Sequence, residues 1–223
     1  MPSMSQKCRM SLPSILFRAL GLSALLVCVQ CGPSAPKRSW KLLEGDLAAQ
    51  WVASGMEKEG ASAVKDGELS LKAGEPMTGM RYQPKAGDSF PPRSYELEYE
   101  TMRSGGADFF GSVTFPAAGS HLTLILGGWG GSLVGISNID GEDASNNRTT
   151  GHLDFVNDRW YRVRIELRDE DLRVWIDRKL FVNVNLRGRG PALRPGEIEK
   201  CLPLGFASYL SDCRVRGLVM REL

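Results

Sequence analysis

One segment of the 223-residue chain gathers most of the side chains that could recognise a ligand. It begins with Trp129, which lies between two Gly pairs, and polar residues follow it. These polar residues are Asn138, Asp140, Glu142, Asp143, Asn146, Asn147 and Arg148. A sugar site needs an aromatic face against the apolar side of the ring, and short carboxylates and amides around the hydroxyl groups. The segment supplies both, so these residues are candidate carbohydrate ligands.

The same segment has two other interpretations. Asn, Asp and Gly are the residues that turns require, so a polar surface loop after a core tryptophan has the same composition. Asp140 and Asp143 also carry the oxygen ligands that Ca²⁺ prefers, although the spacing of an EF-hand is absent. Calcium is the one cofactor that the residues suggest.

The candidate general base is His152, because it lies near Asp154 and the acidic segment. A lone histidine in a loop more often has a structural role, and His121 is the only other histidine. The residues therefore leave open whether the protein is an enzyme.

The elements that must position these residues are strands. Tyr95, Leu97 and Tyr99 alternate with three glutamates, which is typical of a half-buried strand. Asp66-Gly67 between two short apolar runs predicts a hairpin. Further strand patterns cover residues 108–115, 121–126, 160–168, 172–176, 180–184, 204–210 and 215–220. Roughly ten short strands separated by turns predict an all-β sandwich or barrel. The tryptophans in or beside these patterns are predicted to be core residues, namely Trp40, Trp51, Trp160 and Trp175.

Several of these motifs resemble 3-keto-disaccharide hydrolase-like domains of the concanavalin A-like lectin/glucanase superfamily, whose fold laminin-G-like modules share. Leu43-Glu-Gly-Asp-Leu47, followed by Trp51, is similar to the opening motif of these domains. Residues 157–163 resemble their "G-x-W-N" strand, and residues 172–182 resemble a strand pair near their end. The resemblance spans most of residues 40–221. It implies an all-β, concanavalin A-like jelly-roll β-sandwich of two antiparallel sheets.

Three alternative functions remain open, and the resemblance by itself implies only the second of them. The first is a carbohydrate-binding or interaction module, and the second is a glycoside-acting hydrolase of the 3-keto-disaccharide type. The third is a structural domain without a small ligand. The Glu-x-Asp-x-x-Glu strand of the superfamily's glucanases is absent, and Glu96, Glu98 and Glu100 are predicted to point to solvent. Arg178 stands where the family's hairpin turn has Gly.

The N-terminus predicts export to the cell envelope. Lys7, Arg9 and Arg18 precede an apolar run at residues 19–29, which is the pattern of a secretory signal. The predicted organisation is a signal at residues 1–31, a Pro-rich spacer at 32–39 and the domain at 40–223. Cys31 resembles the lipidated cysteine of a bacterial lipoprotein signal, and Cys28 is the alternative. Membrane contact is expected only through this signal or lipid anchor.

Charge and cysteine content limit the remaining possibilities. The chain has 28 Lys and Arg against 26 Asp and Glu, and acids and bases are interleaved, as in residues 162–168. Nucleic-acid binding needs basic residues gathered on one face, so it is not expected. Cys201 and Cys213 are predicted to form a disulfide or to be two buried free thiols.

Overall fold

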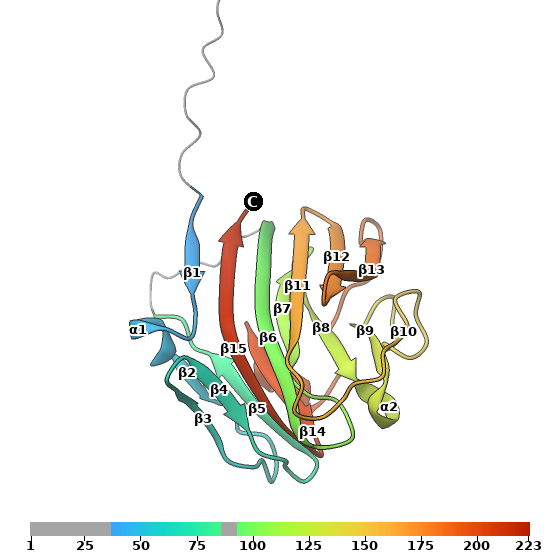
Figure 1. Ribbon diagram of the computed structural model, residues 1–223. Helices are drawn as coiled ribbons and strands as arrows, with labels where there is room; N and C mark the ends of the chain where they lie inside the picture. The colour runs from blue at the N-terminus through green and yellow to red at the C-terminus, as the bar shows by residue number, and fades with distance from the viewer. Residues whose placement is uncertain (1–36, 86–92) are drawn as a thin grey trace, which may run out of the picture. The chain divides into compact units, whose positions relative to one another are not determined.

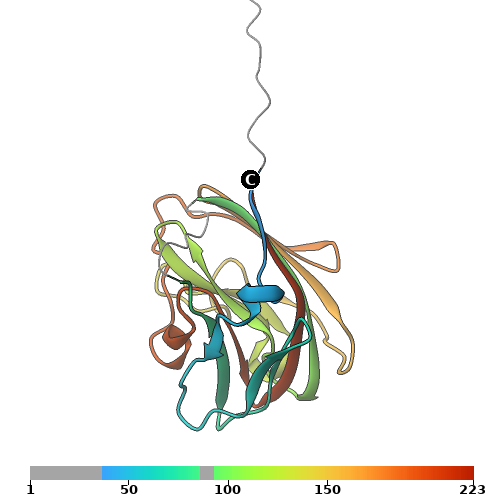
Figure 2. The same cartoon turned by 90° about the vertical axis from the view of Figure 1, so that its left-hand side faces the viewer.

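The computed structural model describes residues 37–85 and 93–223. The predicted export signal with Cys28 and Cys31, and the first part of the spacer, lie outside these residues. In the described ranges, no helix is long and apolar enough to cross a membrane. These residues form two antiparallel sheets that pack face to face (Figures 1 and 2).

Sheet 1 contains the two longest strands of the domain. Its strands are β1 (Ser39–Lys41), β3 (Ser62–Lys65), β4 (Glu68–Leu71), β6 (Ser94–Gly106), β11 (Tyr161–Arg168), β12 (Asp171–Ile176), β13 (Lys179–Asn185) and β15 (Ser211–Glu222). They are ordered β13-β12-β11-β6-β15-β4-β3, and β1 also pairs with β15. The long strands β6 and β15 lie side by side near the middle of the sheet (Figure 1).

Sheet 2 lies next to two of the three short helices that the described residues form. Its strands are β2 (Trp51–Ala53), β5 (Met77–Tyr82), β7 (Ser112–Ala117), β8 (Ser120–Gly127), β9 (Leu133–Ser137), β10 (Gly151–His152) and β14 (Gly205–Tyr209), in the order β10-β9-β8-β7-β14-β5-β2. The helix α2 (Gly128–Gly131) follows β8, and the 3₁₀ helix η1 (Glu197–Cys201) precedes β14. The third helix is α1 (Gly45–Ala48).

The alternation predicted around residues 94–102 is confirmed, and it builds the core. Tyr95, Leu97 and Tyr99 of β6 are fully buried between the sheets. The Tyr99 hydroxyl donates to the Gly111 carbonyl at 3.1 Å, and the Tyr95 hydroxyl donates to the Pro116 carbonyl. Both acceptors lie in or beside β7 of the opposite sheet. The buried phenols are thus hydrogen-bonded, and they tie one sheet to the other.

The outer face of sheet 1 is a lattice of ion pairs. The β6 glutamates point away from the core, as predicted, and arginines of the neighbouring strands β11 and β15 reach them. The pairs include Arg164 with Glu96 at 3.0 Å and Arg216 with Glu100 at 2.7 Å. Cross-strand pairs of opposite charge stabilise a solvated sheet face.

Two tryptophans belong to this outer face. The guanidinium carbon of Arg164 lies 3.8 Å from the ring centroid of Trp175, and that of Arg216 lies 3.9 Å from Trp160. The prediction that both rings are core residues is therefore wrong. They occupy outward positions and are covered by arginines instead of by the other sheet. Trp51 is buried in the core, as predicted.

Cys201 and Cys213 are both buried free thiols, so the predicted disulfide is absent. Cys201 ends η1 and packs with Met56 and Ala207, whereas Cys213 lies in β15 and packs in the main core. Between them the chain forms β14 of sheet 2 and then enters β15 of sheet 1, so the two thiols belong to different clusters of buried residues. Burial raises the pKa of each thiol to about 12.

The turn between β12 and β13 contains backbone strain that a substitution can remove. Asp177 and Arg178 both have positive φ, at 47° and 71°, in the manner of the Asp66-Gly67 turn between β3 and β4. A non-Gly residue in the left-handed region costs about 1 kcal/mol. We therefore expect Arg178→Gly to raise the free energy of unfolding by about 1 kcal/mol in urea denaturation.

Arg178→Ala is the matched control for this variant, because it removes the same side chain and keeps the strained backbone. An equal gain in both variants would assign the effect to the lost charge and would contradict the strain.

Candidate functional site

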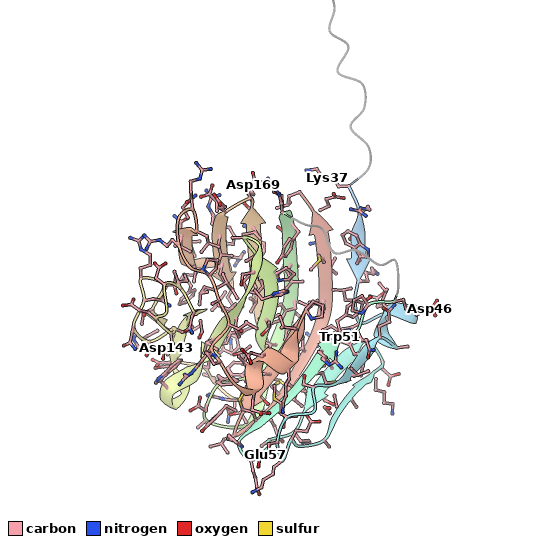
Figure 3. The ribbon with its side chains drawn as sticks, turned by 180° about the vertical axis from the view of Figure 1, so that it is seen from behind. Lys37, Asp46, Trp51, Glu57, Asp143 and Asp169 are labelled. Atoms are coloured by element: carbon pink, nitrogen blue, oxygen red, sulfur yellow. The ribbon has the colours of Figure 1, made fainter. Side chains whose placement is uncertain are left out.

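The outer face of sheet 2 is covered on two sides and open between them. On one side, Ala144 of the 138–150 loop packs on Ile125 and Leu133. On the other side, Cys201 of η1 packs on Ala207. Between these covers lies a pocket of about 380 Å³. Figure 3, which views this face, shows Asp143 at the same side of the sheet as α2.

The pocket draws its lining from the sheet and from three connecting segments. The strands of sheet 2 supply Met77, Thr123, Ile125, Ser137 and Tyr209. The segment before β7 supplies Asp108 and Phe109, and α2 supplies Trp129. The segment that leads into η1, with η1 itself, supplies Arg194, Pro195, Glu197 and Ile198. The lining thus combines three aromatic rings with two carboxylates and one guanidinium.

Trp129 is the most unusual residue of the pocket. The residue is 47% exposed, and its backbone lies in the left-handed region at φ 50° and ψ 52°. A bulky residue is rarely found there, and strain of this kind gathers at functional sites. The interpretation of Trp129 as a core residue is wrong, since the ring is half exposed at the pocket wall.

The acidic segment that follows α2 serves mainly to hold a second loop in place. The Asn138 N–H donates to the Ala192 carbonyl at 2.7 Å, and the Asp140 N–H donates to the Gly190 carbonyl at 3.0 Å. The Asp140 carboxylate accepts from the Gly190 N–H at 2.7 Å and from Arg189 at 2.8 Å. These bonds, the backbone N–H first, lower the pKa of Asp140. We call this pairing of residues 138–140 with residues 189–192 the loop clamp.

The clamp also indicates why Arg194 lies at the pocket. Arg194 lies two residues after the clamped segment, and its guanidinium lies 3.7 Å from the Asp143 carboxylate. The other Asp143 oxygen accepts from the N–H and hydroxyl of Ser145, at 3.0 and 2.6 Å. Asp143 therefore touches a pocket residue but does not line the pocket itself.

The remaining predicted ligands lie outside the pocket. Asn147 is buried and donates to the carbonyls of Ile136, Glu142 and Asp143, so its amide shapes the loop. Asn146 donates to Asp143 at 3.3 Å, and Glu142 and Arg148 are exposed. His152, the candidate base, lies in β10 with Nδ1 3.5 Å from the Ser132 hydroxyl. Of the predicted ligands, Trp129 alone lines the pocket.

The predicted calcium ligands also have other partners, since Asp140 and Asp143 face arginines. Among the residues that the structure describes, no group of three or more His, Cys, Asp or Glu side chains gathers in a way that could hold a metal ion.

The sequence did not indicate the other charged residues of the pocket. Glu197 accepts from the Lys200 ammonium at 3.0 Å and from the Glu57 N–H at 2.9 Å, and these bonds lower its pKa. The carboxylate is therefore ionised and accepts hydrogen bonds. Asp108 accepts from the Phe109 N–H at 2.7 Å and from the Gly130 N–H at 3.4 Å. The one feature of the sequence that favours this region is that residues 187–200 carry no strand pattern, because long connections on a sandwich often hold binding sites.

Small residues of sheet 2 let η1 lie close to the sheet. A Cβ atom at Gly205 would lie 2.6 Å from the Cys201 carbonyl oxygen, and one at Gly79 would lie 2.6 Å from the Met56 side chain. A side chain at Gly205 would clash with the end of η1 and displace it, together with Glu197 and Ile198, from its place beside the pocket.

No family model matches the chain, and its sequence matches no curated protein. Its fold is similar to those of solved structures. The transglycosylase Crh5, in complex with NAG, aligns with a TM-score of 0.54 at 11% identity over 83% of each chain. A carbohydrate esterase from the Shiga toxin-encoding bacteriophage phi24B aligns with a TM-score of 0.50 at 12% identity, over 82% of this chain and 96% of its own. The predicted fold, a concanavalin A-like jelly-roll sandwich of two antiparallel sheets, is confirmed.

The loop clamp predicts a pH dependence of stability. The pKa of Asp140 is lower in the folded protein, so its carboxylate stabilises the fold above its ordinary pKa of about 3.9. That contribution is lost as the pH falls through the lowered folded pKa. We expect the unfolding free energies of the wild type and Asp140→Asn to differ at pH 6 and to converge once the pH falls below the lowered folded pKa.

Urea denaturation between pH 6 and pH 2.5 measures this difference, and Arg189→Met should reduce the same acid-sensitive contribution. A constant offset between wild type and Asp140→Asn at every pH would contradict the role of the Asp140 charge.

Proposed function

We propose that this domain binds a carbohydrate in the pocket on the outer face of sheet 2, as a module of a protein exported to the cell envelope. The observation that carries the proposal is Trp129. A large aromatic ring is held half exposed at a pocket wall by a backbone conformation that favours glycine. A tryptophan that only filled the core would not need this left-handed backbone conformation.

The pocket has the chemistry that a sugar ring requires. Its volume of about 380 Å³ is within the range of small-ligand pockets, roughly 300 to 1,000 Å³. Trp129 and Tyr209 offer aromatic faces to the apolar side of a ring. Glu197 is ionised and accepts hydrogen bonds from hydroxyl groups, and Arg194 donates them.

The fold comparisons support the same class of ligand. Both similar structures bear names from carbohydrate chemistry, one a transglycosylase in complex with NAG and the other a carbohydrate esterase. The support concerns the class of ligand only, because a shared fold hosts many functions.

A glycoside hydrolase of the 3-keto-disaccharide type is the second candidate. The observation in its favour is that two carboxylates, Asp108 and Glu197, line one pocket. The lowered pKa of Glu197 suits a hydrogen-bond acceptor and opposes a role as proton donor. Binding without hydrolysis is therefore the better-supported function.

The N-terminus completes the proposal. A basic segment, an apolar run and Cys31 at its end form a signal of the lipoprotein type, followed by a Pro-rich spacer. We propose that the protein is exported and lipid-anchored through Cys31, with the sandwich displayed beyond the spacer.

Carbohydrate binding is tested with a glycan array, followed by titration of the glycan that binds best. We expect Trp129→Ala to weaken that glycan's affinity about tenfold or more, because stacking against the indole ring is lost. Trp175→Ala, which removes a tryptophan from the outer face of sheet 1, is the matched control and should bind as the wild type does.

A lack of binding to every glycan, or equal affinity of the Trp129→Ala variant, would refute the proposal. Incubation with 3-keto-glucosides and chromatography of the products tests the second candidate, which requires turnover.

Lipid anchoring is tested by fractionating cells that express the full chain. We expect the wild type in the membrane fraction and Cys31→Ser in the soluble fraction, because the thioether-linked lipid is lost. Mass spectrometry of the mature N-terminus identifies the modified residue. Lipid on Cys28, or an unmodified N-terminus, would contradict the assignment to Cys31.

A further inference from the structure

Arg103 is a buried cation close behind the pocket wall. It lies near the end of β6, opposite Cys213 of β15, and the residue is 6% exposed. Burial lowers the pKa of its guanidinium. In the described part of the chain, no carboxylate comes within ion-pair distance of it. Burying a charge without an ionic partner is energetically costly, so the hydrogen bonds of this guanidinium are expected to serve a specific role.

The guanidinium holds two segments that are distant in sequence. Its Nε donates to the Asn157 amide oxygen at 2.6 Å, and Nη2 donates to the Phe155 carbonyl at 3.0 Å. Nη1 donates to the Asp108 carbonyl at 3.3 Å. The guanidinium carbon also lies 5.3 Å from the ring centroid of Phe110. One planar group thus fixes the 155–157 loop and the segment that begins the pocket wall.

The contact continues from Asp108 to the α2 segment. The Asp108 carboxylate accepts from the Gly130 N–H at 3.4 Å, next to Trp129. Gly131 approaches from the same side, and a Cβ atom there would lie 2.6 Å from the Ala107 carbonyl oxygen and 3.4 Å from Nη1 of Arg103. The α2 segment therefore rests on the 107–108 backbone that the guanidinium holds.

We propose that Arg103 is a positioning residue of the pocket, which fixes Asp108 and through it Trp129 without touching the ligand. The proposal rests on the proposed function for the identity of the ligand and deepens it by assigning the support of the site. Arginine suits the role because its rigid planar fork donates in three directions at once. Lysine keeps the charge but cannot reproduce that geometry.

The test measures Trp129 directly, so it does not depend on a ligand. Fluorescence emission and acrylamide quenching are measured for each protein with and without the additional change Trp129→Phe. The difference between the two measurements is the contribution of Trp129. We expect Arg103→Lys to raise the quenching of this contribution and to shift its emission to longer wavelength. Arg187→Lys, which changes an exposed arginine paired with Glu170, should leave both unchanged.

Two further measurements separate positioning from folding. Asn157→Ala removes one hydrogen-bond acceptor of Arg103 at an exposed position and leaves the buried charge in place. We expect it to change Trp129 emission and quenching in the same direction as Arg103→Lys, but by less. It provides the test of positioning if Arg103→Lys does not fold. For the array-selected glycan, we expect Arg103→Lys to bind about tenfold more weakly, because bonds to a charged group are lost.

The outcomes are distinguishable. Altered Trp129 quenching supports positioning even if the wild type binds no glycan, a result that would refute only the proposed function. Folded Arg103→Lys and Asn157→Ala variants with unchanged Trp129 quenching would overturn the proposal, and would leave Arg103 a purely structural residue.

Discussion

The sandwich depends on the aromatic contact between its two sheets. Tyr99 of sheet 1 meets Phe206 of sheet 2 edge to face, with ring centroids 5.0 Å apart, and Trp51 also packs on Phe206, at 5.8 Å. The tyrosine hydroxyl reaches past the rings to a carbonyl beside β7. Such rings bury large apolar areas while their polar ends stay bonded. The inner face of sheet 2 is filled by this layer, which leaves its outer face for the pocket.

Most of the fold follows from the alternation of side chains along the strands. The pattern of Tyr95, Leu97 and Tyr99 placed one face of β6 in the core, and the Asp66-Gly67 turn marked the first hairpin. The pattern missed β5 and β9. In these strands small residues take outward positions that the covering segments bury, namely Gly79 in β5 and Gly135 and Ser137 in β9, so hydrophobic alternation is weak there. Tertiary pairing compensates for this weak local preference.

The site was less predictable, because turns and sugar ligands use the same residue types. Trp129 was identified by its Gly-rich surroundings, but the amides and carboxylates after it proved to shape loops. The pairing of Asp140 with Arg189, 49 residues away, depends on two connections meeting over one sheet. The strand order also brings together three pocket residues that are distant in sequence, Asp108, Glu197 and Tyr209. Nothing in their local sequence marks them, since only the strand order brings them together.

The ion-pair lattice on the outer face of sheet 1 has a consequence for crowded surroundings. Glu166 lies at its centre, 8% exposed, and accepts from Arg168 at 2.8 Å with Arg164 and Arg173 close by. Two copies pressed together at this broad face would have to separate charges that are already matched, and would gain little apolar contact in return. The lattice therefore disfavours self-association of the domain through this face.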